Sequence, residues 1–586
     1  MARTKKPAKK KKVLSPEEIA TRSLQRRHKN EIRATFAAAG FSRVDGAADK
    51  QFTFDGVTSD FDDVFVMENV VVLAEYTITK ESEISAHIKP KYILYEKIAK
   101  RQSDFIAFAR GAPLNLEAAL DSKFHNEHFR VVVLYCSLNT VKAELKDQIP
   151  YAKFLDYSVV RYFKLLTRTV KISSRNEVLA FLGISYSQFG DRAVMSNPPS
   201  REPFPGSVLP ETHSNFPKGF KVVSFYIDPA ALLSRSYVLR RDGWRERSGL
   251  YQRMIIRGKI ESVRKYLVEH KRVFVNNIIV TLPDSTKVLD KNDDTIDPAI
   301  IKKTQAGTIS IPFDFNSIGL IDGQHRVFSY YEGGTNEKVI APLRKQQNLL
   351  VTGIIYPPGV TQDEKTRFEA ALFLEINSNQ ANAKSELKQA INQIIRPFTA
   401  DSIARDVLDK LNDGTGALAD KFARHYFETQ FIKTTSVVSY GLRPLVRPSL
   451  PGPIFSRWVD ADKETFVAAE NDAARKRYID YCATEIAVFI AAAKSQLPSA
   501  LWTTDKKIKD RLLTPTVING LIGAMRQAVE AGVPIDFETL RTAFSGLEKF
   551  PFSTYTSSRY TVMSSDIYSK FLVALAGKAM DPAPSS

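Results

Sequence analysis

The chain has 586 residues and carries 83 Lys and Arg against 65 Asp and Glu, which gives a formal net charge of +18. This length predicts several domains rather than one core, and the basic excess favours a polyanionic partner, first nucleic acid and second an acidic membrane surface. Only two cysteines occur and no apolar run reaches the length of a membrane span, so we expect no disulfide framework, zinc knuckle, signal peptide or membrane helix, and a cytoplasmic location.

The first fifteen residues form a basic low-complexity segment, in which Lys5, Lys6 and all four residues of 9–12 are lysine. We expect this segment to be a disordered tail that either lies along phosphates or only keeps the chain soluble. Residues 16–39 place apolar side chains at helical spacing, and Gly40 is suited to end that helix.

Two strand-like runs follow at residues 61–66 and 70–77. The short segment between them predicts a hairpin. If residues 68–69 form a two-residue loop, Met67 pairs with Val70, and the register of the whole hairpin follows.

In that register Asp62 lies directly opposite Glu75. Two carboxylates that face each other across a ladder repel. A structure tolerates the repulsion if a divalent cation lies between them, and oxygen ligands of this kind suit Mg²⁺ or Mn²⁺. We therefore expect Asp62 and Glu75 to be metal ligands.

This layout resembles the PD-(D/E)xK nuclease superfamily, in which an Asp on one strand and a Glu-x-Lys on the next hold the metal ion and the attacking water. Asp62 matches the first position and Glu75 the second, but Thr77 stands where the family has lysine. The resemblance covers about residues 20–190 and implies a restriction-endonuclease-like α/β domain over residues 16–195. It implies metal-assisted catalysis by Asp62 and Glu75, helped by a Glu of the preceding helix and a Lys of the following segment, with these candidates: Glu31, Lys80, Lys89 and Lys91.

Three interpretations of this domain stay open: an active nuclease, an inactive nuclease-like DNA binder, and an unrelated α/β domain. A buried strand at residues 129–136 and helices around it continue the α/β order. Residues 196–219 are rich in Pro, Ser and Gly, which predicts a linker.

Residues 240–272 hold eleven Lys or Arg against four Asp or Glu, with Trp244, Tyr251 and Tyr266 between them. Such a stretch can follow a nucleic-acid backbone and stack on bases. A solvated helix face is the alternative, and the sequence favours neither.

Residues 318–321 predict a short buried strand, and the next five predict a tight turn and the first turn of a helix: Asp322, Gly323, Gln324, His325 and Arg326. Backbone N–H groups and the positive end of the helix dipole would converge there, with His325 and Arg326 as further donors. This arrangement predicts a phosphate site. The structural alternative is a helix cap by Asp322 and an ion pair of Arg326.

The pentapeptide resembles the signature of the DGQHR-domain family, to which the DndB-type proteins of bacterial DNA phosphorothioation systems belong. That family in turn resembles the ParB/sulfiredoxin fold, whose equivalent element holds nucleotide phosphates. Segments around Gln252 and Arg253, and a later one with Asn377 and Gln380, are similar to further motifs in the same order. The resemblance covers about residues 215–400.

The resemblance implies a ParB/sulfiredoxin-like α+β domain over residues 220–400 that binds a nucleotide or phosphate through these residues. Residues 401–586 carry mostly helical patterns and predict a helical C-terminal extension. The fold class is thus α/β multidomain.

We therefore expect a DNA-binding, Mg²⁺- or Mn²⁺-dependent DNA endonuclease of a bacterial defence or DNA-modification-linked system. The DGQHR domain would act as its sensor for a nucleoside triphosphate or phosphate. One alternative is a non-catalytic DndB-like DNA-binding regulator, and another is a ParB-like nucleotide hydrolase switch. DNA is the expected partner, and formation of a homo-oligomer is left open.

Overall fold

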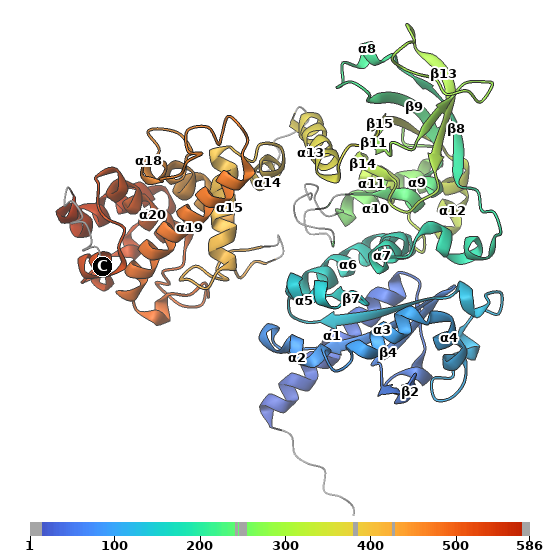
Figure 1. The fold of residues 1–586 in the computed structure, drawn as a ribbon, viewed down its shortest axis with the longest axis horizontal. Helices are drawn as coiled ribbons and strands as arrows, with labels where there is room; N and C mark the ends of the chain where they lie inside the picture. Colours follow the sequence, from blue (N-terminus) through green and yellow to red (C-terminus); the bar gives the residue numbers. More distant parts are fainter. Residues whose placement is uncertain are drawn as a thin grey trace, which may run out of the picture. The chain divides into compact units, whose positions relative to one another are not determined.

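The computed structural model describes residues 15–238, 240, 244, 255–378, 385–424 and 428–576. The chain is mixed α/β with several sheets and a helical C-terminal region (Figure 1). It divides into two compact units, the first mostly up to Thr361 and the second mostly from Gln362 onward. The predicted basic tail, apart from Ser15, lies outside the described residues, as do Gln252, Arg253 and Gln380.

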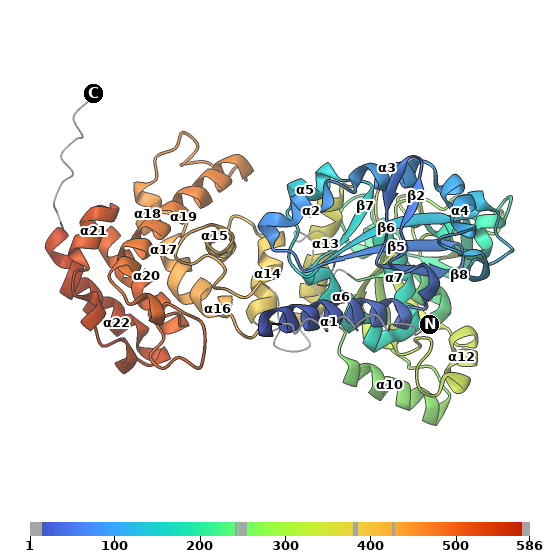
Figure 2. The same ribbon diagram turned by 90° about the horizontal axis from the view of Figure 1, so that it is seen from below.

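The first described helix is α1 (Pro16–Ala38), which confirms the predicted helix. Ser15 and Glu18 form a reciprocal capping box, in which each side chain accepts the backbone N–H of the other residue. The C-terminal half of α1 buries Ile32 and Phe36, whereas its N-terminal half is mostly exposed. Helix α1 lies along α6 (Tyr157–Val170) (Figure 2).

A five-stranded sheet in the order β1-β4-β5-β6-β7 forms the centre of the first half of this unit. In the β4–β5 hairpin Met67 pairs with Val70 and Asp63 with Ala74, which confirms the predicted register. The neighbours β5, β6 and β7 run parallel to one another. The strands are β1 (Ser42–Arg43), β4 (Asp63–Met67), β5 (Val70–Thr77), β6 (Arg130–Ser137) and β7 (Ala152–Leu155), with a separate hairpin of β2 (Phe52–Phe54) and β3 (Val57–Ser59).

Helices cover both faces of this sheet, because its central strands are apolar on both sides. The helical run at residues 91–109 forms two helices, interrupted where Arg101 leaves helical geometry and pairs with Asp55 and Asp104. The helices of this half are α2 (Ile84–Ile88), α3 (Tyr92–Lys100), α4 (Gln102–Arg110), α5 (Ala143–Gln148), α6 and α7 (Arg175–Leu182).

An eight-stranded sheet in the order β10-β14-β11-β15-β9-β8-β13-β12 follows. Its strands are β8 (Arg201–Val208), β9 (Lys221–Ile227), β10 (Ser236–Tyr237), β11 (Ile278–Leu282), β12 (Lys287–Leu289), β13 (Gln305–Pro312), β14 (Ile318–Asp322) and β15 (Leu349–Ile355). Its helices are α8 (Glu211–Ser214), α9 (Pro229–Arg235), α10 (Arg257–His270), α11 (Gln324–Phe328) and α12 (Glu337–Gln346).

The segment expected as a linker, residues 196–219, contains β8, which pairs with β9 and β13 inside this sheet. Phe204 and Val208 are buried and fix the strand to the core. Gly206 is needed for the close packing, because a Cβ there would lie 2.4 Å from the Ser224 carbonyl oxygen. The Pro and Gly content therefore marks a strand with unusual backbone contacts rather than a free connection.

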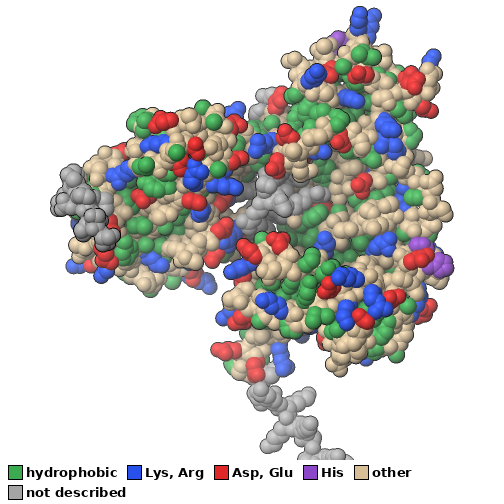
Figure 3. Space-filling view, viewed as in Figure 1, with side chains coloured by type: hydrophobic (Ala, Val, Ile, Leu, Met, Phe, Trp, Pro, Cys, Tyr) green, Lys and Arg blue, Asp and Glu red, His purple; other side chains and the backbone are tan. Residues whose placement is uncertain are grey.

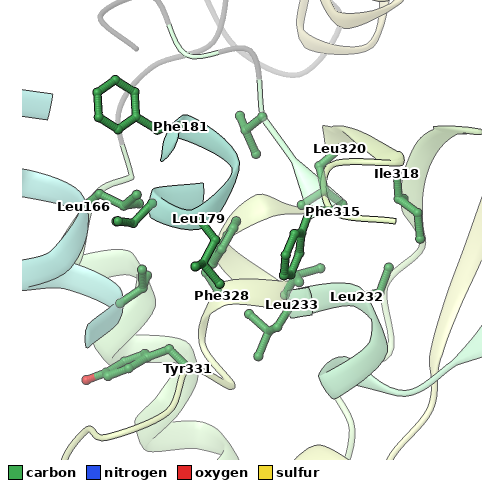
Figure 4. Packing of buried hydrophobic residues seen from close by; sticks show 14 of the residues in the cluster. Leu166, Leu179, Phe181, Leu232, Leu233, Phe315, Ile318, Leu320, Phe328 and Tyr331 are labelled. Atoms are coloured by element: carbon green, nitrogen blue, oxygen red, sulfur yellow. The ribbon is translucent and has the colours of Figure 1, made fainter. Parts of the chain in front are cut away.

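One continuous cluster of buried side chains serves both sheets. Figure 4 shows side chains of α6 and α7 packing towards those of α9, β14 and the segment around α11. The labelled members are Leu166, Leu179, Phe181, Leu232, Leu233, Phe315, Ile318, Leu320, Phe328 and Tyr331.

The second unit is helical and has its own apolar core, which includes Tyr478, Phe489, Ile518 and Leu521. None of the described helices is both long and apolar enough to cross a membrane. The helices are α13 (Gln362–Ser378), α14 (Ser385–Ile395), α15 (Ala400–Asp413), α16 (Thr434–Ser436), α17 (Arg443–Leu445), α18 (Pro453–Arg457), α19 (Asp472–Ser495), α20 (Pro515–Glu530), α21 (Phe537–Ala543) and α22 (Tyr560–Ile567).

Candidate functional site

The β4–β5 hairpin brings the two predicted carboxylates together. Asp62 is the residue before β4, and the pairing of Asp63 with Ala74 puts Asp62 opposite Glu75. The Asp62 Oδ2 atom accepts the backbone N–H of Tyr76 at 2.8 Å, so Asp62 is held against β5.

Lys91 is the lysine that reaches these carboxylates. Its Nζ donates to both carboxylate oxygens of Glu75, at 2.6 and 2.7 Å, and lies 3.5 Å from Asp60 Oδ1. Lys91 immediately precedes α3, whereas Lys80 and Lys89 are exposed and make no ion pair in the described chain. Of the three candidate lysines, Lys91 alone places its ammonium group beside Glu75, where Thr77 supplies no positive charge.

Helix α1 adds a cation that the sequence analysis missed. Lys29 Nζ donates to Asp62 Oδ1 at 2.5 Å. Glu31, the expected acidic contributor of this helix, instead forms an ion pair with Lys164 of α6 and is not brought to the carboxylates. The sequence held a signal for this contact. Lys29 and Arg33 are four residues apart and so share one face of the helix, and the consecutive residues Asp62 and Asp63 stand at the start of the hairpin.

Asp63 has a different role from its neighbour Asp62. Its side chain is fully buried and accepts from Arg33 Nε at 2.7 Å, Arg33 Nη2 at 3.0 Å and also Arg43 Nε. Burial acts against ionisation, but the hydrogen bonds from Arg33 and Arg43 outweigh it and lower the pKa of Asp63. Asp63 therefore ties α1 and β1 to the hairpin.

Glu75 is buried, with 3 % of its surface exposed. Burial raises the pKa of Glu75 to about 7, against the opposing effect of Lys91 and with further raising by Asp62 and Asp60. Close by, the Tyr95 hydroxyl is buried and has no hydrogen-bond partner in the described chain.

This raised pKa predicts a pH-dependent stability in the metal-free protein. Because the folded Glu75 keeps its proton up to about pH 7 while the unfolded one loses it near 4.5, the folded state binds more protons in that window. Its contribution to stability is therefore full below about pH 4.5 and lost as the pH rises through 7. In chelator, the difference in melting temperature between wild type and Glu75→Gln should change between pH 5 and 8, with wild type losing relative stability. A difference in melting temperature that stayed constant over this pH range would contradict the raised pKa of Glu75.

The donor set fits a hard divalent cation. Two carboxylates from adjacent strands offer oxygen ligands, and Mg²⁺ is commonly held by one or two carboxylates with water and phosphate oxygens completing its shell. Among the residues that the structure describes, no group of three or more His, Cys, Asp or Glu side chains is arranged to hold a metal ion. Lys29 and Lys91 contact the oxygens of Asp62 and Glu75 that such an ion would take.

The DGQHR residues form the predicted strand, turn and short helix at the end of β14. Gly323 has φ +101°, a left-handed geometry that favours glycine. Arg326 Nη2 donates to Asp322 Oδ2 at 2.7 Å. With the side-chain amide group of Asn276 rotated by half a turn, Arg326 Nη1 also donates to the Asn276 amide oxygen at 3.2 Å. The ion pair of the structural alternative is therefore present. Its helix cap by Asp322 is not, because Gly323 is the N-cap residue of α11 and no side chain caps the helix there.

His325 is also engaged by the fold. Its Nε2 accepts the backbone N–H of Ile256 at 3.2 Å. Burial, together with Lys259 and Arg240, lowers the pKa of His325 to about 4, so the ring is neutral near pH 7. Gln324 differs, because its side-chain oxygen is buried without a hydrogen-bond partner in the described chain.

Asn377 belongs to α13 of the second unit, and its side-chain amide donates to the Phe373 carbonyl at 2.8 Å within the same helix. Asn377 and the DGQHR turn thus belong to different units of the chain. The other expected members, Gln252, Arg253 and Gln380, lie outside the described residues.

We expect Gly323→Ala to lower stability by about 1–3 kcal/mol. A Cβ at this position would lie 2.5 Å from Ile278 Cδ1, and the left-handed backbone adds strain. Gly258→Ala in α10 is the matched control, because no atom lies within 4 Å of its Cβ and its φ is ordinary. Urea unfolding should show a loss for the first variant and no loss for the second. Equal effects would contradict a special role of the turn.

The basic stretch of residues 240–272 is only partly described, and two of its arginines are buried. Arg240 donates to the Tyr162 hydroxyl and to Glu177, and Arg264 donates to the carbonyl oxygens of Ser329, Tyr331 and Thr335. Neither guanidinium is available to a nucleic-acid backbone. In Figure 3, Lys and Arg side chains are interspersed with Asp and Glu, so the basic excess is not gathered into one patch on that face.

Comparison of the chain with family models, curated proteins and solved structures gave no match.

Proposed function

We propose that this chain is a Mg²⁺- or Mn²⁺-dependent DNA endonuclease whose active site consists of Asp62, Glu75 and Lys91. The contact of Lys91 with both oxygens of Glu75 carries the proposal, because Lys91 supplies the positive charge that the nuclease family has at the position of Thr77. The confirmed hairpin register supports it further, since it sets Asp62 opposite Glu75.

In this proposal Asp62 and Glu75 hold the metal ion, which would polarise the phosphate and lower the pKa of a bound water. Lys91 lies where it can balance negative charge that develops on a phosphate oxygen. Burial of Glu75 lowers the local dielectric constant, which strengthens each of these electrostatic interactions.

The proposed setting is a bacterial system that defends against foreign DNA or responds to DNA modification. This part rests on the resemblance of residues 322–326 to the DGQHR signature, with the second half of the first unit as the sensor. A core shared by the two sheets would give a sensor a direct mechanical connection to the hairpin.

A plasmid-nicking assay tests the function. Supercoiled plasmid is incubated with the purified full chain and Mg²⁺ or Mn²⁺, with and without nucleoside triphosphates, and parallel samples contain excess chelator. We expect conversion to open-circular or linear DNA only with metal. Cleavage that persists in chelator would refute the metal-dependent site.

Lys91→Ala should reduce cleavage by about 10²-fold, the usual cost of removing one group that stabilises transition-state charge. Lys97→Ala in α3, the helix that Lys91 precedes, is the matched control, because Lys97 pairs with Asp55, away from Glu75. Single-turnover cleavage rates of both variants should differ by that factor. Equal rates would show that Lys91 only neutralises Glu75 in the resting protein.

A non-catalytic DNA-binding regulator is the second candidate. It is favoured by Thr77 at the position where the nuclease family has lysine, and by the absence, among the described residues, of a group of three or more metal-ligating side chains. Binding of duplex DNA without cleavage under any metal condition would support this candidate.

A further inference from the structure

One face of α1 carries four basic side chains at successive turns: Arg22, Arg26, Lys29 and Arg33. Their spacing of four, three and four residues keeps them within a narrow stripe of the helix. The last two contact the consecutive residues Asp62 and Asp63. The stripe therefore leads directly to the candidate active site.

The first two residues of the stripe are free. Arg22 and Arg26 are exposed, and neither forms an ion pair with an acidic side chain among the described residues. They lie on the N-terminal half of α1, which projects beyond the part of the helix that packs on the sheet (Figures 1 and 2). At a rise of about 1.5 Å per residue, Arg26 lies roughly one turn and Arg22 roughly two turns from Lys29, towards the N-terminus of the helix.

Arg27 provides an internal comparison. It is exposed like Arg26 and is its neighbour in sequence, but it lies about 160° around the helix from Lys29, by the rotation of about 100° per residue. The face of α1 that meets the active site is therefore specifically the one that carries Arg22 and Arg26.

We propose that Arg22 and Arg26 bind consecutive phosphates of duplex DNA and guide the strand to Asp62 and Glu75. This inference rests on the proposed nuclease function and identifies the surface that holds its substrate. Exposed guanidinium groups with no acidic partner suit phosphate, which they can grip with two donors. Lys29, which contacts Asp62, would be the last cation along this path.

Fluorescence anisotropy with a short labelled duplex tests the inference, in chelator so that no cleavage occurs. The full chain is compared with Arg26→Glu, Arg22→Glu and the control Arg27→Glu, which makes the same change of charge on the opposite face. We expect Arg26→Glu and Arg22→Glu each to weaken binding about tenfold and to reduce the slope of log affinity against log salt by about one. Arg27→Glu should change affinity by no more than about twofold.

The outcomes separate this inference from the nuclease proposal. Equal weakening by Arg26→Glu and Arg27→Glu, or no weakening by either, would overturn the inference, even if the wild type cleaves plasmid. A selective loss with Arg26→Glu supports it, also if no metal condition gives cleavage, in which case only the nuclease proposal fails. Circular dichroism melting excludes a folding defect, and Arg26→Lys, which keeps the charge, should retain most of the affinity.

Discussion

Asp62→Asn and Glu75→Gln are each expected to reduce metal-dependent DNA cleavage by about 10³-fold or more. Each change keeps the size of the side chain but removes a negative oxygen ligand, so the proposed ion would lose half of its protein carboxylates. The measurement is the single-turnover rate on supercoiled plasmid over a range of Mg²⁺ and Mn²⁺ concentrations. Partial rescue at high Mn²⁺ would agree with weakened metal binding.

The folded state should survive both changes. Asp62 is partly exposed, and Glu75→Gln removes a carboxylate whose raised pKa shows that burial disfavours its charge. Melting temperatures near neutral pH should therefore stay close to the wild-type value. Full cleavage activity in either variant would refute the site, whereas unfolding would leave the Lys91 comparison as the decisive test.

Asp63→Asn should destabilise the protein by about 3 kcal/mol while leaving the metal site untouched. The change removes the charge that Arg33 and Arg43 share at a fully buried position. Urea unfolding measures the loss, and Asp62→Asn is the matched control one residue away. An equal effect of both changes on stability would contradict the separate roles of the two aspartates.

Acid should have a related effect on Asp63. Because its folded-state pKa is lowered, its stabilising contribution is present above the ordinary pKa of an aspartate and is lost as the pH falls through the lower, folded-state value. The wild type should thus lose its advantage over Asp63→Asn only in strong acid. This pH range lies well below the range in which Glu75 is expected to lose its proton.

Local patterns in the sequence predicted the hairpin well. Two apolar runs and a short loop set the register, and that register placed Asp62 opposite Glu75. The extent of α1 also followed from neighbouring residues, whereas its capping box was not predicted. These features depend on contacts between residues close in the chain.

Features that depend on distant contacts were not predictable in the same way. The sequence offered three lysines after β5, and only the packing of the segment before α3 selects Lys91. Likewise, the strand β8 is recognisable only once β9 and β13 lie on either side of it, because Pro and Gly hide its pattern. The ion pairs of Lys29 and Arg33 need the sheet to bring β4 beneath α1.

The apolar cluster between the two sheets makes the first unit indivisible in practice. A recombinant fragment that ended near residue 195 would leave Leu166, Leu179 and Phe181 without the side chains that cover them in Figure 4. Such a fragment would present an apolar surface to water and tend to aggregate. A substitution in the core of either sheet would also affect the folding of the other, because both sheets share this core.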